Sequence, residues 1–185
     1  MTREEQRDSW RQGLLELLEP VVYAVVVVAI ISGFFLRIEM VSGDSMNPTL
    51  HEGDRLLVQQ CFYQPQIGDV VICNQPNFSG KPFVKRIIAM GGQTVDIDFF
   101  SGIVSVDGEM LVEPYLYDLI RNTPALDQRL EFPLTVPEGQ IFVLGDNRNY
   151  STDSRSILIG TVDERYVVGR VWLRLYPLDQ LGRIE

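Results

Sequence analysis

The feature of this sequence that most limits its fold is a run of seventeen residues without a charged side chain, from Pro20 to Leu36. Glu19 and Arg37 bracket the run. At about 1.5 Å of rise per residue, a helix of this length is roughly 25 Å long, the short end of what crosses a bilayer. Core helices of soluble domains rarely carry four consecutive valines and no polar face. The run therefore predicts a transmembrane helix over residues 20–37.

A cleavable signal peptide is the competing interpretation of the same run. Such a peptide needs a positive start and a small-residue cleavage site. Residues 1–19 hold three arginines against five acids, and no Ala-x-Ala follows the run. We therefore expect an uncleaved signal anchor. Because three arginines precede the run and Arg37 follows it, the positive-inside rule places residues 1–19 in the cytoplasm and residues 38–185 outside it.

Beyond the apolar run, the chain changes to short segments rich in β-branched residues and separated by Gly, Pro, Asn or Asp. These segments are RLLVQQCF, DVVICN, FVKRIIAM, TVDIDF, GIVSVDG, QIFVLGD and RYVVGRVWLRLYP. The segment from Tyr115 to Glu131 has weaker patterning and is expected to be a loop. The pattern predicts a mainly β fold, with one antiparallel β-sheet domain over residues 38–185 tethered by one N-terminal transmembrane helix.

Charge and cysteine content exclude some classes of protein. A formal net charge of -9 argues against nucleic acid as a partner, because its phosphates would be repelled. The two cysteines, Cys61 and Cys73, are too few for a disulfide framework and lack metal-site spacing. They either pair in an oxidising compartment or stay as buried thiols in neighbouring strands.

The turn sequence SGDSMNPTL places a serine, Ser45, between Gly43 and Pro48, so its hydroxyl is expected to be presented at the surface. A serine in a turn is usually a turn former, and a nucleophilic serine needs a base within hydrogen-bond reach. The chain has one histidine, His51, six residues further on. That short separation makes a Ser-His pair awkward, and a solvated loop histidine is the alternative.

The two lysines are the other candidate bases. Lys81 lies in the loop sequence SGKPF and is expected to be solvated. Lys85 lies in a strand-like run, where alternation places Phe83, Lys85 and Ile87 on one face. Burial there would lower the pKa of the amine, and a neutral amine could take a serine proton. The alternative is a strand lysine that reaches solvent, with Arg86 doing so on the other face.

The segment GDNRNYSTDSR, from Gly145 to Arg155, packs carboxylates, arginines and hydroxyls behind a strand-like run. A calcium loop of the EF-hand type does not fit, because Arg148 falls where the second oxygen ligand should be. Two interpretations stay open: a surface turn with Asp–Arg pairs, or a rigid hydrogen-bonded support for catalytic side chains.

Taken in order, several motifs resemble the type I signal peptidases, the Ser-Lys serine proteases that remove signal peptides from exported proteins. These motifs are SGDSMNPTL, GDRLLV, GDVVIC, VKRIIAM, VDGEMLVEPYL, VPEGQIFVLGDNRNYSTDSR and VVGRVWLRLYPLDQLGRI. The resemblance covers nearly the whole chain. It implies the β-sheet catalytic domain of that family, attached to a single membrane anchor.

The resemblance also implies which residues are catalytic. Ser45 matches the nucleophile and Lys85 the general base. Gly43 stands where part of the family has a hydroxyl residue, so the backbone N–H of Ser45 is expected to supply the oxyanion hole. Asn149 and Tyr150 replace the usual Asp-Asn in the last motif.

The last motif would support the site. Ser151 matches the hydroxyl that orients the lysine, and Gly145 the glycine near the site. Asp153 and Arg155 match a structural ion pair.

The activity implied by the resemblance is cleavage of exported preproteins after small residues, at sites of the Ala-x-Ala type, through an acyl-enzyme on the serine. No metal or cofactor is needed. The expected partners are signal peptides and the lipid bilayer, with transient proximity to the translocation machinery. The expected location is the cell membrane or the thylakoid membrane, in a single pass with a cytoplasmic N-terminus and an extracytoplasmic catalytic domain.

Three other classes of protein share some of these features. A cytosolic Ser-Lys self-cleaving repressor would carry a DNA-binding segment instead of an apolar run. A conjugative or pilus-associated processing peptidase shares the chemistry and stays open. A catalytically dead, membrane-tethered binding module would be expected to lack Ser45 or Lys85, and both are present.

Overall fold

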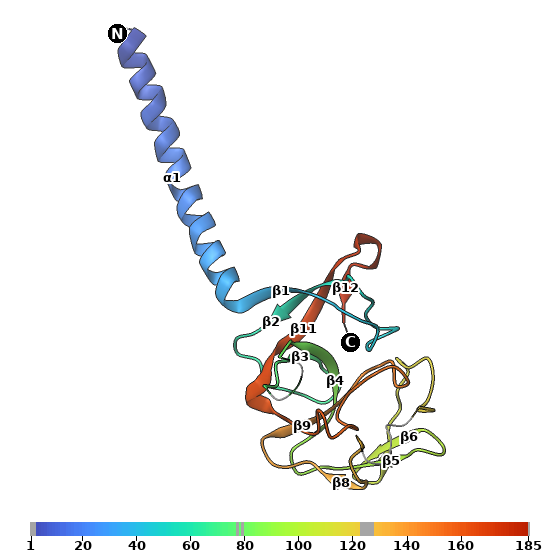
Figure 1. Ribbon diagram of the computed structural model, residues 1–185. Helices are drawn as coiled ribbons and strands as arrows, with labels where there is room; N and C mark the ends of the chain where they lie inside the picture. Colours follow the sequence, from blue (N-terminus) through green and yellow to red (C-terminus); the bar gives the residue numbers. More distant parts are fainter. Residues whose placement is uncertain (1–2, 77, 79, 123–127, 185) are drawn as a thin grey trace.

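A long helix leads into a β-rich domain that carries the rest of the chain (Figure 1). The computed structural model describes residues 3–76, 78, 80–122 and 128–184, without the side chains of residues 3–12, 14, 15, 31, 32 and 34. The strands are β1 (Leu36–Met40), β2 (Arg55–Gln59), β3 (Val70–Cys73), β4 (Phe83–Met90), β5 (Thr94–Asp98), β6 (Ile103–Val106), β7 (Glu109–Met110), β8 (Leu134–Thr135), β9 (Gln140–Leu144), β10 (Val162–Asp163), β11 (Val167–Tyr176) and β12 (Gly182–Arg183). The helices are α1 (Arg3–Phe35) and two 3-10 turns, η2 (Glu164–Tyr166) and η3 (Leu178–Gln180).

Helix α1 extends away from the β domain, and its N-terminal end is the point furthest from it (Figure 1). The helix starts well before Pro20 and ends at Phe35, so Leu36 and Arg37 already belong to strand β1. In the part of the chain whose side chains are described, no helix is long and apolar enough to cross a membrane. The transmembrane anchor over residues 20–37 stays a prediction.

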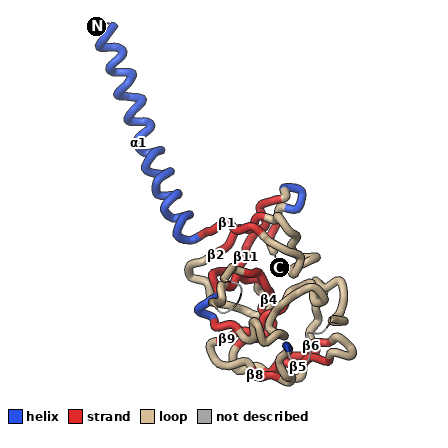
Figure 2. The backbone as a smooth tube through the Cα atoms, viewed as in Figure 1, coloured by secondary structure: helices blue, strands red, loops and turns tan. Residues whose placement is uncertain are grey.

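The larger sheet is antiparallel throughout, as the alternating short runs predict. Its strand order is β1-β2-β11-β3-β4-β9-β10, with β12 added beside β11. Long strand β11 lies between β2 and β3, which are separated from it by about a hundred residues of chain. Figure 2 shows how much of the domain outside the strands is loop. The predicted mainly β fold is confirmed for this part of the chain.

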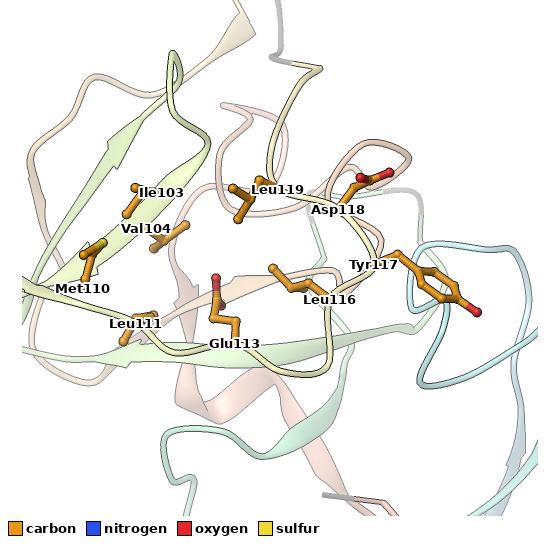
Figure 3. Close-up of a pocket in the computed structure, with 9 residues that line it drawn as sticks. All are labelled: Ile103, Val104, Met110, Leu111, Glu113, Leu116, Tyr117, Asp118 and Leu119. Carbon is orange, nitrogen blue, oxygen red and sulfur yellow. The ribbon is translucent and has the colours of Figure 1, made fainter.

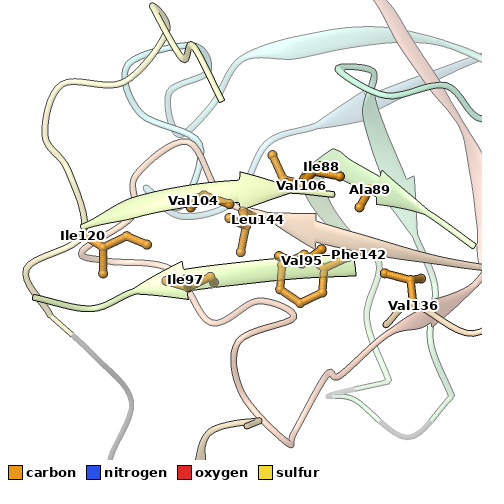
Figure 4. Packing of buried hydrophobic residues seen from close by; sticks show 10 residues of the cluster. All are labelled: Ile88, Ala89, Val95, Ile97, Val104, Val106, Ile120, Val136, Phe142 and Leu144. Carbon is orange, nitrogen blue, oxygen red and sulfur yellow. The ribbon is translucent and has the colours of Figure 1, made fainter. Parts of the chain in front are cut away.

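A smaller antiparallel sheet, in the order β7-β6-β5-β8, packs near the β4–β9 end of the larger one. Its inward side chains meet those of β4 and β9 in one apolar cluster (Figure 4). The buried members are Ile88, Ala89, Val95, Ile97, Val104, Val106, Ile120, Val136, Phe142 and Leu144. This cluster buries one face of β4, the strand that carries Lys85.

A second apolar cluster lies under the loop between β1 and β2. Val41, Met46 and Leu50 come from this loop and are at most 4% exposed. They pack with side chains of β2, β3 and β11. Because hydrophobic residues on both sides of Ser45 are buried, the loop is fixed to the sheet and does not hang free.

The weakly patterned segment after β7 forms no regular helix or strand between residues 111 and 122. The prediction of a loop excursion is confirmed there, and residues 123–127 lie outside the described part. The excursion crosses from the small sheet towards the segment after β9, where Asn149 accepts hydrogen bonds from the backbone N–H groups of Arg121 (2.7 Å) and Asn122 (2.9 Å).

Candidate active site

Ser45 sits in a tight turn whose backbone is closed by local hydrogen bonds. Asn47 N donates to Asp44 O at 3.1 Å, and Leu50 N donates to Met46 O at 2.9 Å. Ser45 itself is half-buried between the exposed Asp44 and the buried Met46. The turn therefore presents the hydroxyl while the next residue anchors it.

Lys85 reaches this hydroxyl from strand β4. Its Nζ lies 2.7 Å from Ser45 Oγ and also donates to Val84 O at 2.8 Å. The residue is 3% exposed, because β4 runs between β3 and β9 in the middle of the sheet. The structure thus joins two residues forty positions apart in one partly buried hydrogen bond.

Burial lowers the pKa of Lys85 from 10.5 to about 8, because the charged ammonium loses its hydration. Asp153 and Asp146 act in the other direction and favour the charged form, while Arg155 disfavours it. The Cys73 thiol is itself buried, which raises its pKa to about 12, so it stays neutral beside the amine. A substantial fraction of Lys85 is therefore neutral near pH 8, the state that can accept a proton.

Gly145 lies where the loop after β9 passes Ser45. A Cβ at this position would lie 2.4 Å from Ser45 O and 2.2 Å from Ser151 Oγ, so only glycine fits without a shift of backbone. Next to it, Asn147 N donates to Ser45 O at 3.0 Å. The loop therefore fixes the carbonyl of Ser45 and leaves its side chain to Lys85.

The predicted pair Asp153–Arg155 stabilises this loop from inside the domain. Arg155 donates from Nε to Asp153 Oδ1 at 2.7 Å and from Nη2 to Oδ2 at 2.9 Å. Burial alone would raise the pKa of Asp153, but Arg155, the Gly145 N–H and the Ser151 hydroxyl together outweigh burial, and the pKa is lowered. Asp153 Oδ2 also accepts from Gly145 N at 3.1 Å. Both residues are about 1% exposed, so the pair is internal and not a surface turn.

Ser151 lies against Gly145 and is buried at its oxygen. Its hydroxyl helps to lower the pKa of Asp153, yet it forms no hydrogen bond of ordinary geometry within the described residues. Lys85 Nζ donates instead to Ser45 and Val84. The orienting role of Ser151 towards the lysine stays a prediction.

One residue of the site was not found from the sequence. Arg86, which the alternative interpretation of this strand places in solvent, is 2% exposed. It donates to both carboxylate oxygens of Asp146 at 2.9 and 2.7 Å, and to Gly68 O at 2.8 Å. The signal available in the sequence was the position of Arg86 within the apolar run FVKRIIAM. An arginine in the middle of a buried strand has to be paired with an acid inside the domain.

The other candidates lie elsewhere. His51 is exposed and its backbone N–H donates to Asp54, so it takes no part in the contact with Ser45. Lys81 is exposed in its loop. No disulfide joins Cys61 and Cys73. Within the described residues, no group of three or more His, Cys, Asp or Glu side chains could hold a metal ion.

Comparison with known proteins gives one consistent family. The family model described as signal peptidase, peptidase S26, matches residues 14–176. A probable signal peptidase I-1 from Synechocystis sp. is 35% identical over 177 residues, which cover 89% of this chain and 84% of that protein. A signal peptidase I from Bacillus licheniformis is 33% identical over 98% of this chain and 99% of its own length. A crystal structure of a signal peptidase I from Enterococcus faecalis matches with a TM-score of 0.47 and 34% identity, over 59% of this chain and 97% of that one.

Proposed function

Because the chain belongs to the signal peptidase family, peptidase S26, we propose that it removes signal peptides from exported preproteins with Ser45 as nucleophile and Lys85 as general base. Family membership makes the protein a serine peptidase, a hydrolase of peptide bonds. The observation that carries the residue assignment is the 2.7 Å contact between the buried Lys85 Nζ and Ser45 Oγ. A lysine in this state is the proton acceptor that a serine without a histidine needs.

The acylation step begins with neutral Lys85 taking the proton of Ser45 Oγ. The resulting oxygen nucleophile attacks the carbonyl carbon of the scissile peptide bond, and negative charge develops on the carbonyl oxygen. The backbone N–H of Ser45 donates a hydrogen bond to that oxyanion. When the C–N bond breaks, protonated Lys85 gives its proton to the leaving amine, which is the new N-terminus of the mature protein.

Deacylation uses the same two groups. Neutral Lys85 takes a proton from a water molecule, and the water oxygen attacks the ester carbonyl on Ser45. Collapse of the intermediate breaks the ester bond, and the proton on Lys85 returns to Ser45 Oγ. The signal peptide leaves as a carboxylic acid, which releases the remaining proton of the water to solvent and becomes a carboxylate, so the step balances without a metal or cofactor.

The loop after β9 supports this pair by position and charge. Gly145 allows the loop to touch the carbonyl of Ser45. Asp153, held by Arg155, keeps a negative charge near Lys85 and limits how far burial lowers its pKa. Ser151 has an oxygen that is buried beside the same glycine and is proposed to orient Lys85.

Helix α1 is proposed to anchor the protein in a membrane. Leu17, Val21, Val25 and Val28 on this helix are 54 to 70% exposed in the isolated chain. Apolar side chains exposed along a helix are unfavourable in water. Lipid tails can cover them on all sides, and a helix in contact with lipid needs no polar face. The anchor would place Ser45, ten residues after the end of α1, near the membrane surface where signal peptides are held. Restricting both to one surface favours their encounter.

The proposed topology is a single pass with residues 1–19 in the cytoplasm and the β domain outside it, in the cell membrane or the thylakoid membrane. The proposed substrates end their signal peptides in Ala-x-Ala. Small pockets beside Ser45 would exclude larger side chains by steric clash. An extended peptide would add its backbone to a strand edge near the site.

A gel assay tests the proposal. Detergent-solubilised protein is incubated with a preprotein that carries an Ala-x-Ala junction, next to Ser45→Ala at the same concentration. We expect cleavage at the junction by the unmodified protein and its loss in Ser45→Ala. If Ser45→Ala cleaves as well as the unmodified protein, the assignment of the nucleophile is wrong. If neither cleaves in detergent or in lipid vesicles, the proposed activity is wrong.

A further inference from the structure

The excursion after β7 contains a Glu-Pro-Tyr sequence to which the mechanism above gives no role. Of these three residues, Glu113 lines a cavity of about 320 Å³ together with other side chains of the excursion and of β6 and β7. Figure 3 shows Glu113 in this lining, between Leu111 and Leu116. A carboxylate among leucines needs a partner, and its partner lies in the loop that packs against the nucleophile.

Glu113 forms a two-pronged ion pair with Arg148. Arg148 Nη1 donates to Glu113 Oε2 at 2.9 Å, and Nη2 donates to Oε1. The side chains are 0% exposed for Arg148 and 8% for Glu113. The third donor of the guanidinium, Nε, donates to Gly145 O at 3.1 Å. Glu113 therefore holds, through one arginine, the glycine that touches both Ser45 O and Ser151.

Tyr115, two residues further on, contacts a second arginine of the site. Its hydroxyl donates to Glu113 Oε1 at 2.7 Å. Its ring faces the guanidinium of Arg86, whose Cζ lies 4.0 Å from the ring centroid. Arg86 is the neighbour of Lys85 in β4 and carries Asp146 on its other edge. The tyrosine therefore contacts the arginine that adjoins the proposed base.

These contacts add a third segment to two elements that already meet through the pairing of β4 with β9 and through the Arg86–Asp146 ion pair. Arg86 belongs to β4, while Arg148 belongs to the loop after β9. Two neighbouring side chains of a third segment touch both arginines, so they help to set the spacing of β4 and the loop. That spacing decides whether Lys85 Nζ and Ser45 Oγ meet at hydrogen-bond distance.

We propose that Glu113 and Tyr115 are positioning residues of the peptidase, forming a clamp that keeps β4 and the loop after β9 at the separation needed for the Ser45–Lys85 contact. The inference rests on the proposed function for its catalytic consequence. Neither residue touches the reacting atoms. A purely structural ion pair would lower stability when removed but would leave the environment of Lys85 unchanged in the molecules that fold.

The test measures that environment directly. Because Lys81 and Lys85 are the two lysines of the chain, NMR of full-length protein with ¹³C-labelled lysine can titrate Lys85, with exposed Lys81 as an internal reference. In Glu113→Gln we expect water to reach Lys85 and its pKa to rise from about 8 towards 10.5. Loss of a negative charge alone would lower that pKa, so a rise reports the loosened geometry. The charged and titratable groups that act on Lys85, Asp153, Cys73, Asp146 and Arg155, are all left in place.

The same variant should cleave an Ala-x-Ala preprotein with kcat lowered about tenfold and KM changed less than twofold, because misplacement within the site slows the reaction more than it weakens binding. The matched control is Glu109→Gln, an exposed carboxylate in β7, which should keep both kcat and the lysine pKa. The clamp is refuted if folded Glu113→Gln matches the control in both measurements.

Tyr115→Phe keeps the test decisive if Glu113→Gln does not fold. It removes the hydrogen bond to Glu113 and leaves the ring against Arg86, so we expect a smaller rise of the Lys85 pKa and a two- to fivefold loss of kcat. A tyrosine variant with unchanged pKa and kcat then overturns the proposal. The titration needs no preprotein, so absence of cleavage by the unmodified protein would refute the proposed function and leave the clamp to be judged on the Lys85 pKa.

Discussion

The substitution Lys85→Met should make the protein inactive and more stable. Methionine nearly matches lysine in length but carries no charge. A lysine pKa lowered from 10.5 to about 8 means that burying the ammonium costs about 3 kcal/mol at pH 7. Methionine removes that cost but also removes the hydrogen bonds to Ser45 and Val84, at about 1 kcal/mol each. We expect a net gain of about 1 kcal/mol in the free energy of unfolding at pH 7.

The sign of the pH dependence makes this prediction sharper. The folded pKa of Lys85 lies below the unfolded value, so between pH 8 and 10.5 the unfolded chain binds more protons and the unmodified protein gains stability as the pH rises. Methionine does not titrate. The cost of charging Lys85 should therefore fall below about 1 kcal/mol at pH 10, so the lost hydrogen bonds should make Lys85→Met the less stable protein there, by about 1 kcal/mol.

The assay is denaturant unfolding of both detergent-solubilised proteins at several pH values from 7 to 10, followed by near-UV circular dichroism of the β domain. The difference between the two proteins cancels the titration of all other groups. If Lys85→Met is less stable than the unmodified protein at pH 7, and the difference does not change with pH, burial does not lower the pKa of Lys85 and does not cost stability.

Three further outcomes are expected. The kcat/KM of the unmodified protein should rise about tenfold per pH unit below pH 8 and level off above it, because Lys85 becomes neutral. Initial rates measured from pH 6 to 10 would check this, and a flat profile would contradict it. Gly145→Ala should lower kcat about 100-fold, because a Cβ 2.4 Å from Ser45 O forces the backbone there to shift by about 1 Å. A variant that cleaves as well as the unmodified protein in the gel assay would refute the close packing. Asp153→Asn should lower the free energy of unfolding by about 3 kcal/mol, since Arg155 stays buried without its partner. Because Asp153 favours the charged form of Lys85, the variant should also move the rising limb of the pH–rate profile to lower pH. Unchanged unfolding and rates would show that Asp153 does not support the site.

The fold class could be predicted from the sequence because its signals are local. Alternating β-branched runs, such as those that form β5 and β6, predict strands from their own residues alone. The weak patterning after Tyr115 likewise indicated a loop. The short strands β1 and β7 were not predicted, because pairing with β2 and β6 defines them more than their own residues do.

The candidate site was found from motif order, yet its physical state came from the tertiary structure. Residue types alone favoured a turn former at Ser45 and a solvent-reaching strand lysine at Lys85 over catalytic roles. Forty residues of chain separate them, and only the pairing of β4 with β3 and β9 buries the amine and directs it at the hydroxyl. Burial by distant strands is also what lowers the pKa of Lys85, a quantity that a local sequence pattern does not contain.

The sequence by itself determined the apolar run, the succession of strands and the residue types available for chemistry, because each depends on neighbours within a few positions. The tertiary structure decided which charges are internal. Arg86, Arg148 and Arg155 look like surface residues in the sequence, and each is paired inside the domain with a carboxylate. Their partners lie between 2 and 60 residues away, so the long-range pairs form only when the two sheets and the excursion between them have packed together.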